Sequence, residues 1–130
     1  MNPHEEQFVR SFVVAKKRDR YFTLLQSTKG RPHLLSGFNH CHDLDPRYAT
    51  LIPSNQQSAA SIESLLRRKG ATDSCFVIST NRDIDGREMP LSDALAETVG
   101  VNMGTFISCV PGKLGYFEME DLSHRYILQR

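Results

Sequence analysis

The most chemically reactive stretch of this chain is the run His40-Cys41-His42-Asp43-Leu44-Asp45-Pro46-Arg47. Imidazole, thiol and carboxylate groups bind metals or transfer protons, and the guanidinium of arginine pairs with anions. The backbone limits how these groups cooperate, because alternate side chains of an extended segment point to opposite faces. The two histidines would then face away from the cysteine and the acids. Only a turn would bring all of these groups to one point.

Two interpretations of residues 40–47 follow from their types. In the structural one, Asp45 caps a short helix, Pro46 occupies the first helical position, and Arg47 is solvated or ion-paired. In the functional one, the run is a metal or acid–base site, although it lacks a second ligand pair at a spacing typical of zinc sites. The structural interpretation is favoured, and the sequence leaves open whether a metal binds. The predicted ligand contacts are His40, His42, Asp43, Asp45, Arg47 and, from a later loop, Arg87.

A second polar run, Asn81-Arg82-Asp83-Ile84-Asp85-Gly86, resembles the opening of an EF-hand-type calcium loop. It carries oxygen side chains at positions one, three and five and glycine at position six. The resemblance covers these six residues and then fails, because Ser92 stands where calcium needs a bidentate glutamate, and Pro90 interrupts the loop. We therefore predict an Asp-Gly turn that joins a strand to a helix. Arg87 follows this turn and can line a pocket at the edge of the sheet.

Cys109 is a further candidate, at the end of a predicted strand. A nucleophilic thiol would need a histidine within hydrogen-bonding distance, and the sequence offers His40, His42 and His124 for that role. A buried cysteine that acts as a small apolar side chain is far commoner. Ser108 lacks the pattern of a nucleophile elbow. No catalytic set is therefore evident from the residues.

Positive charge is concentrated near the N-terminus, although the net charge is only +1. Between residues 10 and 31, seven basic residues stand against the single acid Asp19, whereas residues 80–130 carry an excess of acids. Basic side chains around Tyr21 and Phe22 are typical of a surface that binds phosphates and stacks on bases. The same aromatics also fit a helix core, and short charge runs usually mark solvated turns. The nucleic-acid alternative would use Lys16, Lys17, Arg18, Arg20, Lys29 and Arg31.

Length and composition predict a single domain, because 130 residues that are 39% hydrophobic suffice for one packed core. The first twenty residues lack the pattern of a secretion signal, and no window approaches the roughly 20 apolar residues of a membrane span. Cys41, Cys75 and Cys109 are odd in number and widely spaced, which predicts reduced thiols and a cytoplasmic location. The opposite charges of the two parts favour self-association as a homo-oligomer or binding to another protein, and no cofactor or membrane contact is expected.

Hydrophobic periodicity predicts an α+β fold with a helical part at residues 1–50, a connector at 51–57 and an α/β part at 58–130. The order Asn2-Pro3 has the form of an N-cap followed by a first helical residue, so we expect the first helix to run from Pro3 to about Ala15. A second short helix should follow, and the remaining apolar residues before residue 40 also suit helices. We expect this helical part to pack on a small sheet.

The α/β part should contain a helix that ends near Arg68, just before Gly70. A strand at 75–79, a helix capped by Ser92 and a strand at 104–110 then suggest a parallel β-α-β crossover. Two more strand candidates follow, at 113–120 and 124–129, and would form a C-terminal antiparallel meander. The predicted sheet is therefore mixed and has about four strands.

These observations predict a small binding or interaction module rather than an enzyme, because polar groups cluster without a complete catalytic set. One alternative is a metal-assisted or thiol-dependent hydrolase that uses the cluster His40–Asp45 and Cys109. The other is a nucleic-acid-binding protein that uses the basic stretch 10–31.

Overall fold

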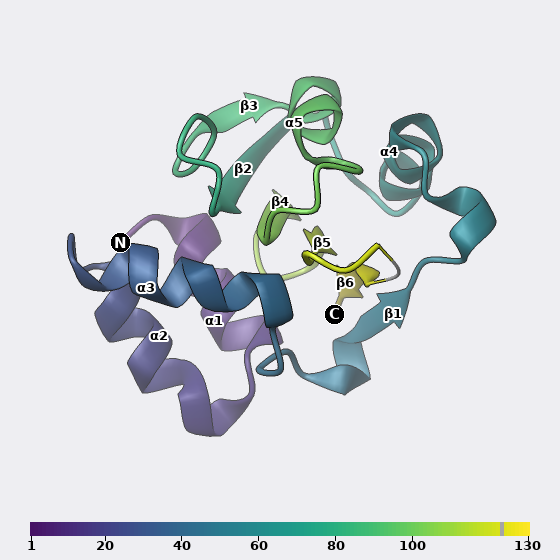
Figure 1. The fold of residues 1–130 in the computed structure, drawn as a ribbon. Coiled ribbons are helices and arrows are strands. Elements are labelled where there is room, and N and C mark those ends of the chain that lie inside the picture. The colour runs from purple at the N-terminus through teal and green to yellow at the C-terminus, as the bar shows by residue number, and fades with distance from the viewer. Residues whose placement is uncertain (123) are drawn as a thin grey trace.

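A computed structural model describes residues 1–122 and 124–130 of the chain. Three helices come first, and most strands lie in the second half (Figure 1). None of the described helices is both long enough and apolar enough to cross a membrane. The helices are α1 (Pro3–Phe12), α2 (Arg18–Leu25), α3 (Gly30–Ser36), α4 (Ala59–Arg68) and α5 (Leu91–Thr98), with the short 3₁₀ turns η1 (Ala15–Lys17), η2 (Gly37–His40), η3 (Pro46–Tyr48) and η4 (Ser54–Gln56). The strands are β1 (Ala49–Leu51), β2 (Ser74–Ser79), β3 (Glu88–Pro90), β4 (Thr105–Val110), β5 (Leu114–Glu118) and β6 (Arg125–Gln129).

The strands of the described residues form one sheet of six in the order β1-β6-β5-β4-β2-β3. Each neighbouring pair in this order is antiparallel. The two edge strands, β1 and β3, have three residues each, and such short edges offer little free backbone to other chains. The predicted α+β class is confirmed. The expected mixed sheet of about four strands is wrong, because the sheet in the described part of the chain has six strands and its pairs are all antiparallel.

Both faces of the sheet are buried, each against its own helices (Figure 1). Along β2, Phe76 and Ile78 belong to the core shared with α1, α2 and α3, whereas Cys75 and Val77 belong to the core shared with α4 and α5. Burial on both sides makes the strands continuously apolar instead of alternating. The sheet therefore separates a helical N-terminal layer from a layer formed by α4 and α5.

Five phenylalanines fill the contact between the N-terminal layer and the sheet, and each is at most 1% exposed: Phe8, Phe12, Phe38, Phe106 and Phe117. The ring of Phe8 on α1 lies 4.4 Å from that of Phe106 on β4, measured between centroids, and that of Phe38 lies 5.1 Å from Phe117 on β5. Aromatic pairs at such distances stabilise a core beyond the area that they bury. This cluster holds α1 and η2 on the sheet.

The predicted parallel crossover is wrong, and the cause is β3. The short strand β3 pairs antiparallel with β2 and reverses the chain before α5 begins. Helix α5 then returns the chain so that β4 also pairs antiparallel with β2. The sequence of β3, Glu88-Met89-Pro90, is too short and too polar to indicate a strand. The continuous apolar runs of β2 and β4 added to the error, because they are more typical of parallel sheets.

The predicted helix ends were partly right. Asn2 caps α1 by accepting a hydrogen bond from the backbone N–H of His4, as expected. Helix α1 nevertheless ends at Phe12 instead of Ala15, and Pro90, not Ser92, precedes the first residue of α5. The predicted connector at 51–57 contains the end of β1 and the turn η4, and β1 pairs with β6.

Gly104 allows η2 to approach the beginning of β4. A Cβ atom at this position would lie 2.5 Å from the backbone carbon of Phe38 and 2.6 Å from the backbone nitrogen of Asn39. The backbone N–H of Gly104 donates to Oδ1 of Asn39 at 2.8 Å, and the carbonyl of Asn39 accepts from the N–H of Glu120. These two hydrogen bonds hold Asn39 between the residue that precedes β4 and the segment that follows β5.

We predict that Gly104→Ala lowers the free energy of unfolding by about 1–3 kcal/mol, because the added methyl group overlaps backbone that cannot move aside easily. Gly37→Ala is the matched control, since a Cβ there meets nothing within 4 Å. Urea unfolding of the two variants measures the difference, and equal stabilities would contradict the proposed close approach.

Candidate ligand-binding site

Arg31 joins three distant segments of the chain through its guanidinium. Its Nε donates to Oδ2 of Asp85 and its Nη2 donates to Oδ1 of Asp85, each at 2.9 Å. Its Nη1 also forms an ion pair with Glu5 on α1. The three side chains are 20%, 19% and 10% exposed, respectively. Burial by itself lowers the pKa of Arg31, but the hydrogen bonds and charges of Asp85 and Glu5 outweigh it and raise the pKa above its ordinary value.

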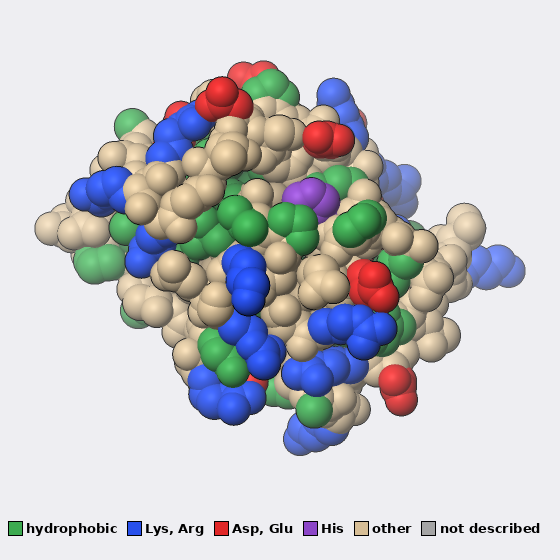
Figure 2. Space-filling view, turned by 180° about the vertical axis from the view of Figure 1, so that it is seen from behind, with side chains coloured by type: hydrophobic (Ala, Val, Ile, Leu, Met, Phe, Trp, Pro, Cys, Tyr) green, Lys and Arg blue, Asp and Glu red, His purple; other side chains and the backbone are tan. Residues whose placement is uncertain are grey.

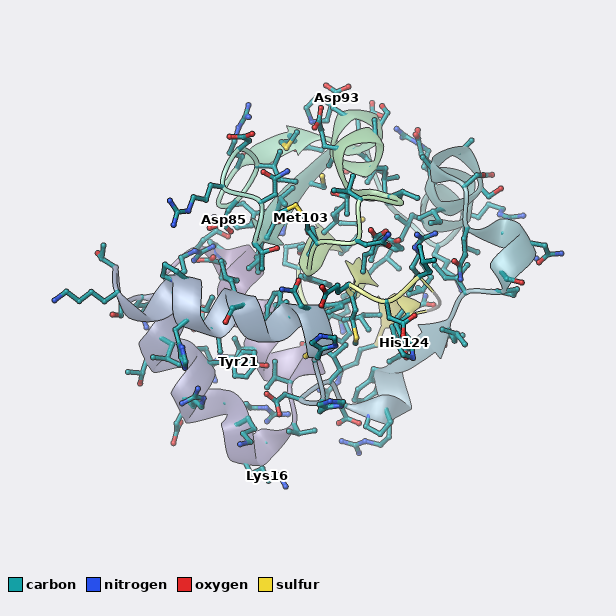
Figure 3. All side chains as sticks on the ribbon, in the orientation of Figure 1. Lys16, Tyr21, Asp85, Asp93, Met103 and His124 are labelled. Carbon is teal, nitrogen blue, oxygen red and sulfur yellow. The ribbon has the colours of Figure 1, made fainter. Side chains whose placement is uncertain are left out.

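Beside this ion cluster lies a pocket of about 260 Å³ between α3 and the connection from β2 to β3. We call it the Arg31 pocket, and Figure 3 shows Asp85 in this connection beside α3. Oδ1 of Asp85 also accepts from the backbone N–H of Ser79, so this carboxylate is held from two sides. The residues that line the Arg31 pocket are Arg31, Pro32, Leu35, Ser36, Asn39, Ser79, Thr80, Arg82 and Asp85.

A second pocket, of about 280 Å³, lies on the other side of α3 and meets the first at Ser36. We call it the histidine pocket. Its walls come from α2, α3, η2 and the two residues His42 and Asp43. It is lined by Arg20, Tyr21, His33, Leu34, Ser36, Gly37, His40, His42 and Asp43.

The structure divides the predicted run 40–47 into two parts with different roles. His40, His42 and Asp43 line the histidine pocket. Asp45 instead caps η3 by accepting from the backbone N–H of Arg47 at 3.0 Å, and Pro46 stands at the first position, which confirms the structural interpretation for these residues. Hydrogen bonds from the side chain and backbone of Arg47 lower the pKa of Asp45 to about 2.

Backbone bonds tie the same run to the end of α1. The N–H of Asp45 donates to the carbonyl of Phe12, and the N–H of Val14 donates to the carbonyl of Asp43. An isolated antiparallel bridge between Val13 and Leu44 lies between these bonds. The run therefore holds the N-terminal layer together in addition to lining a pocket.

Arg87 lies outside both pockets. Its side chain is exposed and donates to the carbonyl of Asp83 at 3.1 Å. The predicted turn is present, with Gly86 at a φ of 73° and the N–H of Asp83 bonded to Oδ1 of Asn81. It joins β2 to the strand β3, however, and not directly to a helix as expected. Because Asp85 is paired with Arg31, its carboxylate is not directed to a calcium position.

Metal and thiol chemistry gain no support from the part of the chain that is described. No three histidine, cysteine, aspartate or glutamate side chains there are placed to hold a metal ion. His40 and His42 line a further small pocket of about 150 Å³ with His124. Cys109 is buried in the core beneath α4 and α5, where burial and the charge of Cys75 raise its pKa to about 12. Its thiol keeps its proton at neutral pH and is a poor nucleophile.

The side chains of the basic stretch 10–31 have different surroundings, and some of them are paired with groups of the protein itself. Arg31 belongs to the ion cluster, and Nε of Arg18 donates to the carbonyl of Val13 at 3.0 Å. Lys16 and Lys29 are exposed, and Arg20 is exposed beside the histidine pocket. Lysine and arginine side chains gather over the lower half of the face seen from behind (Figure 2), which is opposite the side on which α3 lies (Figure 1).

The structure also pairs His4 with Ser108, two residues that no local spacing in the chain connects. Nδ1 of His4 lies 2.7 Å from Oγ of Ser108, and the imidazole stacks on Phe76 with 5.5 Å between centroids. Burial lowers the pKa of His4 below its ordinary value, and the charge of Glu88 opposes this in part. A serine beside a histidine can act as a nucleophile. Ser108 is only 1% exposed, however, so a substrate does not reach its hydroxyl in this structure.

Compared with models of protein families, with curated proteins and with solved structures, the chain has no significant match.

We predict that Asp85→Asn lowers the free energy of unfolding by about 1–3 kcal/mol, because it leaves the partly buried Arg31 with one fewer charged partner. The partial exposure of both side chains keeps the loss below that of a fully buried pair. Asp83→Asn, in the same turn and exposed, should change stability by less than about 0.5 kcal/mol. Urea denaturation of both variants measures the contrast, and similar losses would show that the ion cluster does not matter.

A second prediction concerns the pH dependence of stability. The folded state holds the pKa of His4 below the ordinary value of 6.5, so near and below that pH the unfolded chain takes up a proton that the folded chain resists. The contribution of neutral His4 is fully present above pH 6.5 and is lost as pH falls below it. His4→Gln should therefore lose less stability than the original chain between about pH 8 and about pH 5. Parallel stability curves from urea midpoints would contradict this.

Proposed function

We propose that this chain is a binding module that holds a small organic anion in the Arg31 pocket. The observation that carries the proposal is the state of the polar groups in the wall. The groups of the ion cluster are paired with one another, whereas Arg82 and Asn39 of the same lining keep unused hydrogen-bond donors. A pocket prepared in this way binds without first breaking its own contacts.

The carboxylate of Asp85 does not repel an anion strongly, because two arms of Arg31 and one backbone N–H bond to it. Arg82 is exposed and has no hydrogen bond or ion pair with another described residue. Its guanidinium is therefore available for a carboxylate, which it can bind with two parallel hydrogen bonds. The free charge of the pocket is positive.

Asn39 supplies a second donor. Its Oδ1 is occupied by the N–H of Gly104, so the amide group is fixed and its NH₂ end remains for a ligand. Pro32 and Leu35 provide an apolar part of the wall. Pockets with apolar walls and a few placed polar groups are typical of small-ligand sites. The volume of about 260 Å³ suits a compact molecule with one carboxylate and a short apolar group.

The test is a set of small carboxylic acids, such as butyrate, succinate and benzoate, added to ¹⁵N-labelled protein. Amide shifts should change in residues 31–39 and 79–85. Arg82→Gln should weaken binding about tenfold or more, because a charged hydrogen bond is lost. Arg87→Gln is the matched control from the same connection and should change affinity less than about twofold, since Arg87 lies outside the pocket.

Two outcomes would contradict the proposal. One is an absence of saturable shifts with every acid. The other is an equal effect of the Arg82 and Arg87 substitutions, which would show that the anions respond to general surface charge.

A further inference from the structure

The histidine pocket differs chemically from the Arg31 pocket. Four of its lining side chains, Arg20, His33, His40 and His42, carry or can carry a positive charge, whereas Asp43 is the single acid in its lining. They come from segments that are separate in the sequence, and the packing of α2 against α3 brings them together.

The single acid is restrained within the wall. The hydroxyl of Tyr21 donates to Oδ2 of Asp43 at 2.9 Å. Burial, with added contributions from Cys41 and Asp43, raises the pKa of Tyr21, so the phenol remains protonated and continues to donate. This hydrogen bond offsets part of the negative charge of Asp43. Tyr21 lies in the space between α2 and α3, as its label in Figure 3 shows.

Three of these four side chains are free to donate hydrogen bonds to a ligand. Arg20, His33 and His42 are exposed, and their side chains have no hydrogen bond or ion pair with another described residue. His40 differs, because its Nε2 lies 2.8 Å from Oε2 of Glu120. An imidazole donates an N–H in either charge state, and a guanidinium binds phosphate oxygens in pairs.

We infer that the histidine pocket binds the phosphate group of a small phosphorylated ligand. The pocket of about 280 Å³ is far larger than the roughly 30 Å³ that one water molecule occupies, so an organic group fits beside the phosphate. A metal ion fits less well, because no three metal-binding side chains converge in the described part of the chain. The site is separate from the proposed carboxylate site, since Arg82 does not line it.

A small ligand is favoured over a polynucleotide. Of the six basic residues expected to contact nucleic acid, only Arg20 lines this pocket. Arg31 and Arg18 are bound to groups of the protein itself. Lys16 lies at the outer end of the N-terminal layer, away from the pocket (Figure 3). A continuous track of free cations for a phosphate backbone is therefore interrupted.

The experiment is a titration of ¹⁵N-labelled protein with inorganic phosphate and with phenyl phosphate, followed by amide shifts. Both probes should move residues 33–43, and phenyl phosphate should bind more tightly because of its organic group. Arg20→Gln should weaken binding about tenfold, because a charged hydrogen bond is lost, and His33→Gln about threefold or more, because the imidazole N–H donor is lost. Lys16→Gln is the control and should change affinity less than about twofold.

A gain of binding provides a test that structural damage cannot imitate. Glu120→Gln removes a negative charge and releases His40, so phosphate should bind about two- to threefold more tightly. Arg82→Gln should leave phosphate binding unchanged even if it abolishes carboxylate binding, which separates this inference from the proposed function.

Three results would overturn the inference. The first is no saturable binding of either phosphate. The second is weakening by Lys16→Gln that equals the weakening by Arg20→Gln. The third is tight, salt-sensitive binding of single-stranded DNA that depends on Lys16, which would make a polynucleotide the partner.

Discussion

The attachment of α3 to α1 and to the connection between β2 and β3 depends on one guanidinium held between two carboxylates. Arg31 on α3 forms ion pairs with Asp85 in the connection from β2 to β3 and with Glu5 on α1. Taking three charges partly out of water is costly, and their mutual attraction offsets the cost only when the geometry is good. The two parallel bonds from Arg31 to Asp85 meet that condition. Helix α3 is thereby fixed at its beginning, which leaves its outer side free to form pockets.

A second polar network, centred on Glu118, holds the connection that leads from α5 into β4. Glu118 on β5 is fully buried and accepts from the hydroxyl of Tyr116 and from the backbone N–H groups of Gly100 and Asn102. Nε of Arg125 lies 3.3 Å from the same carboxylate. This network holds the connection from α5 to β4, where Asn102 has a φ of 60°. The next contact along the chain joins Gly104 to Asn39, so the network helps to position a wall of the Arg31 pocket.

Helix α3 lies between the Arg31 pocket and the histidine pocket, which share Ser36 in their linings and differ in chemistry. In the Arg31 pocket, Asp85 accepts three hydrogen bonds from Arg31 and the backbone N–H of Ser79. The guanidinium of Arg82 and the amide NH₂ of Asn39 remain for the proposed ligand. In the histidine pocket a single acid is tied to a tyrosine, and imidazoles dominate. Ser36 lines both pockets, and its exposed hydroxyl donates to the backbone carbonyl of His33 and not to a side chain that could act as a base. Recognition of small anions is the function that we propose for these two pockets.

The sequence by itself determined the local features of this protein. It predicted the cap at Asn2, the turn that begins at Asp45, the Asp-Gly turn and the α+β class, because each depends on neighbouring residues or on hydrophobic periodicity. It also directed attention to His40, His42 and Asp43. It could not predict the direction of β4 relative to β2, which follows from a three-residue strand without a clear pattern.

Only the tertiary structure decided which groups meet. Arg31 and Asp85 are 54 positions apart, and His4 and Ser108 are 104 positions apart, so nothing in local spacing connects them. The basic stretch appeared uniform in the sequence, yet packing placed Arg31, partly buried, against two carboxylates and left Arg20 beside three histidines. Local sequence fixes the conformation of a segment, whereas the charges that remain free for a ligand depend on which distant partners the fold supplies.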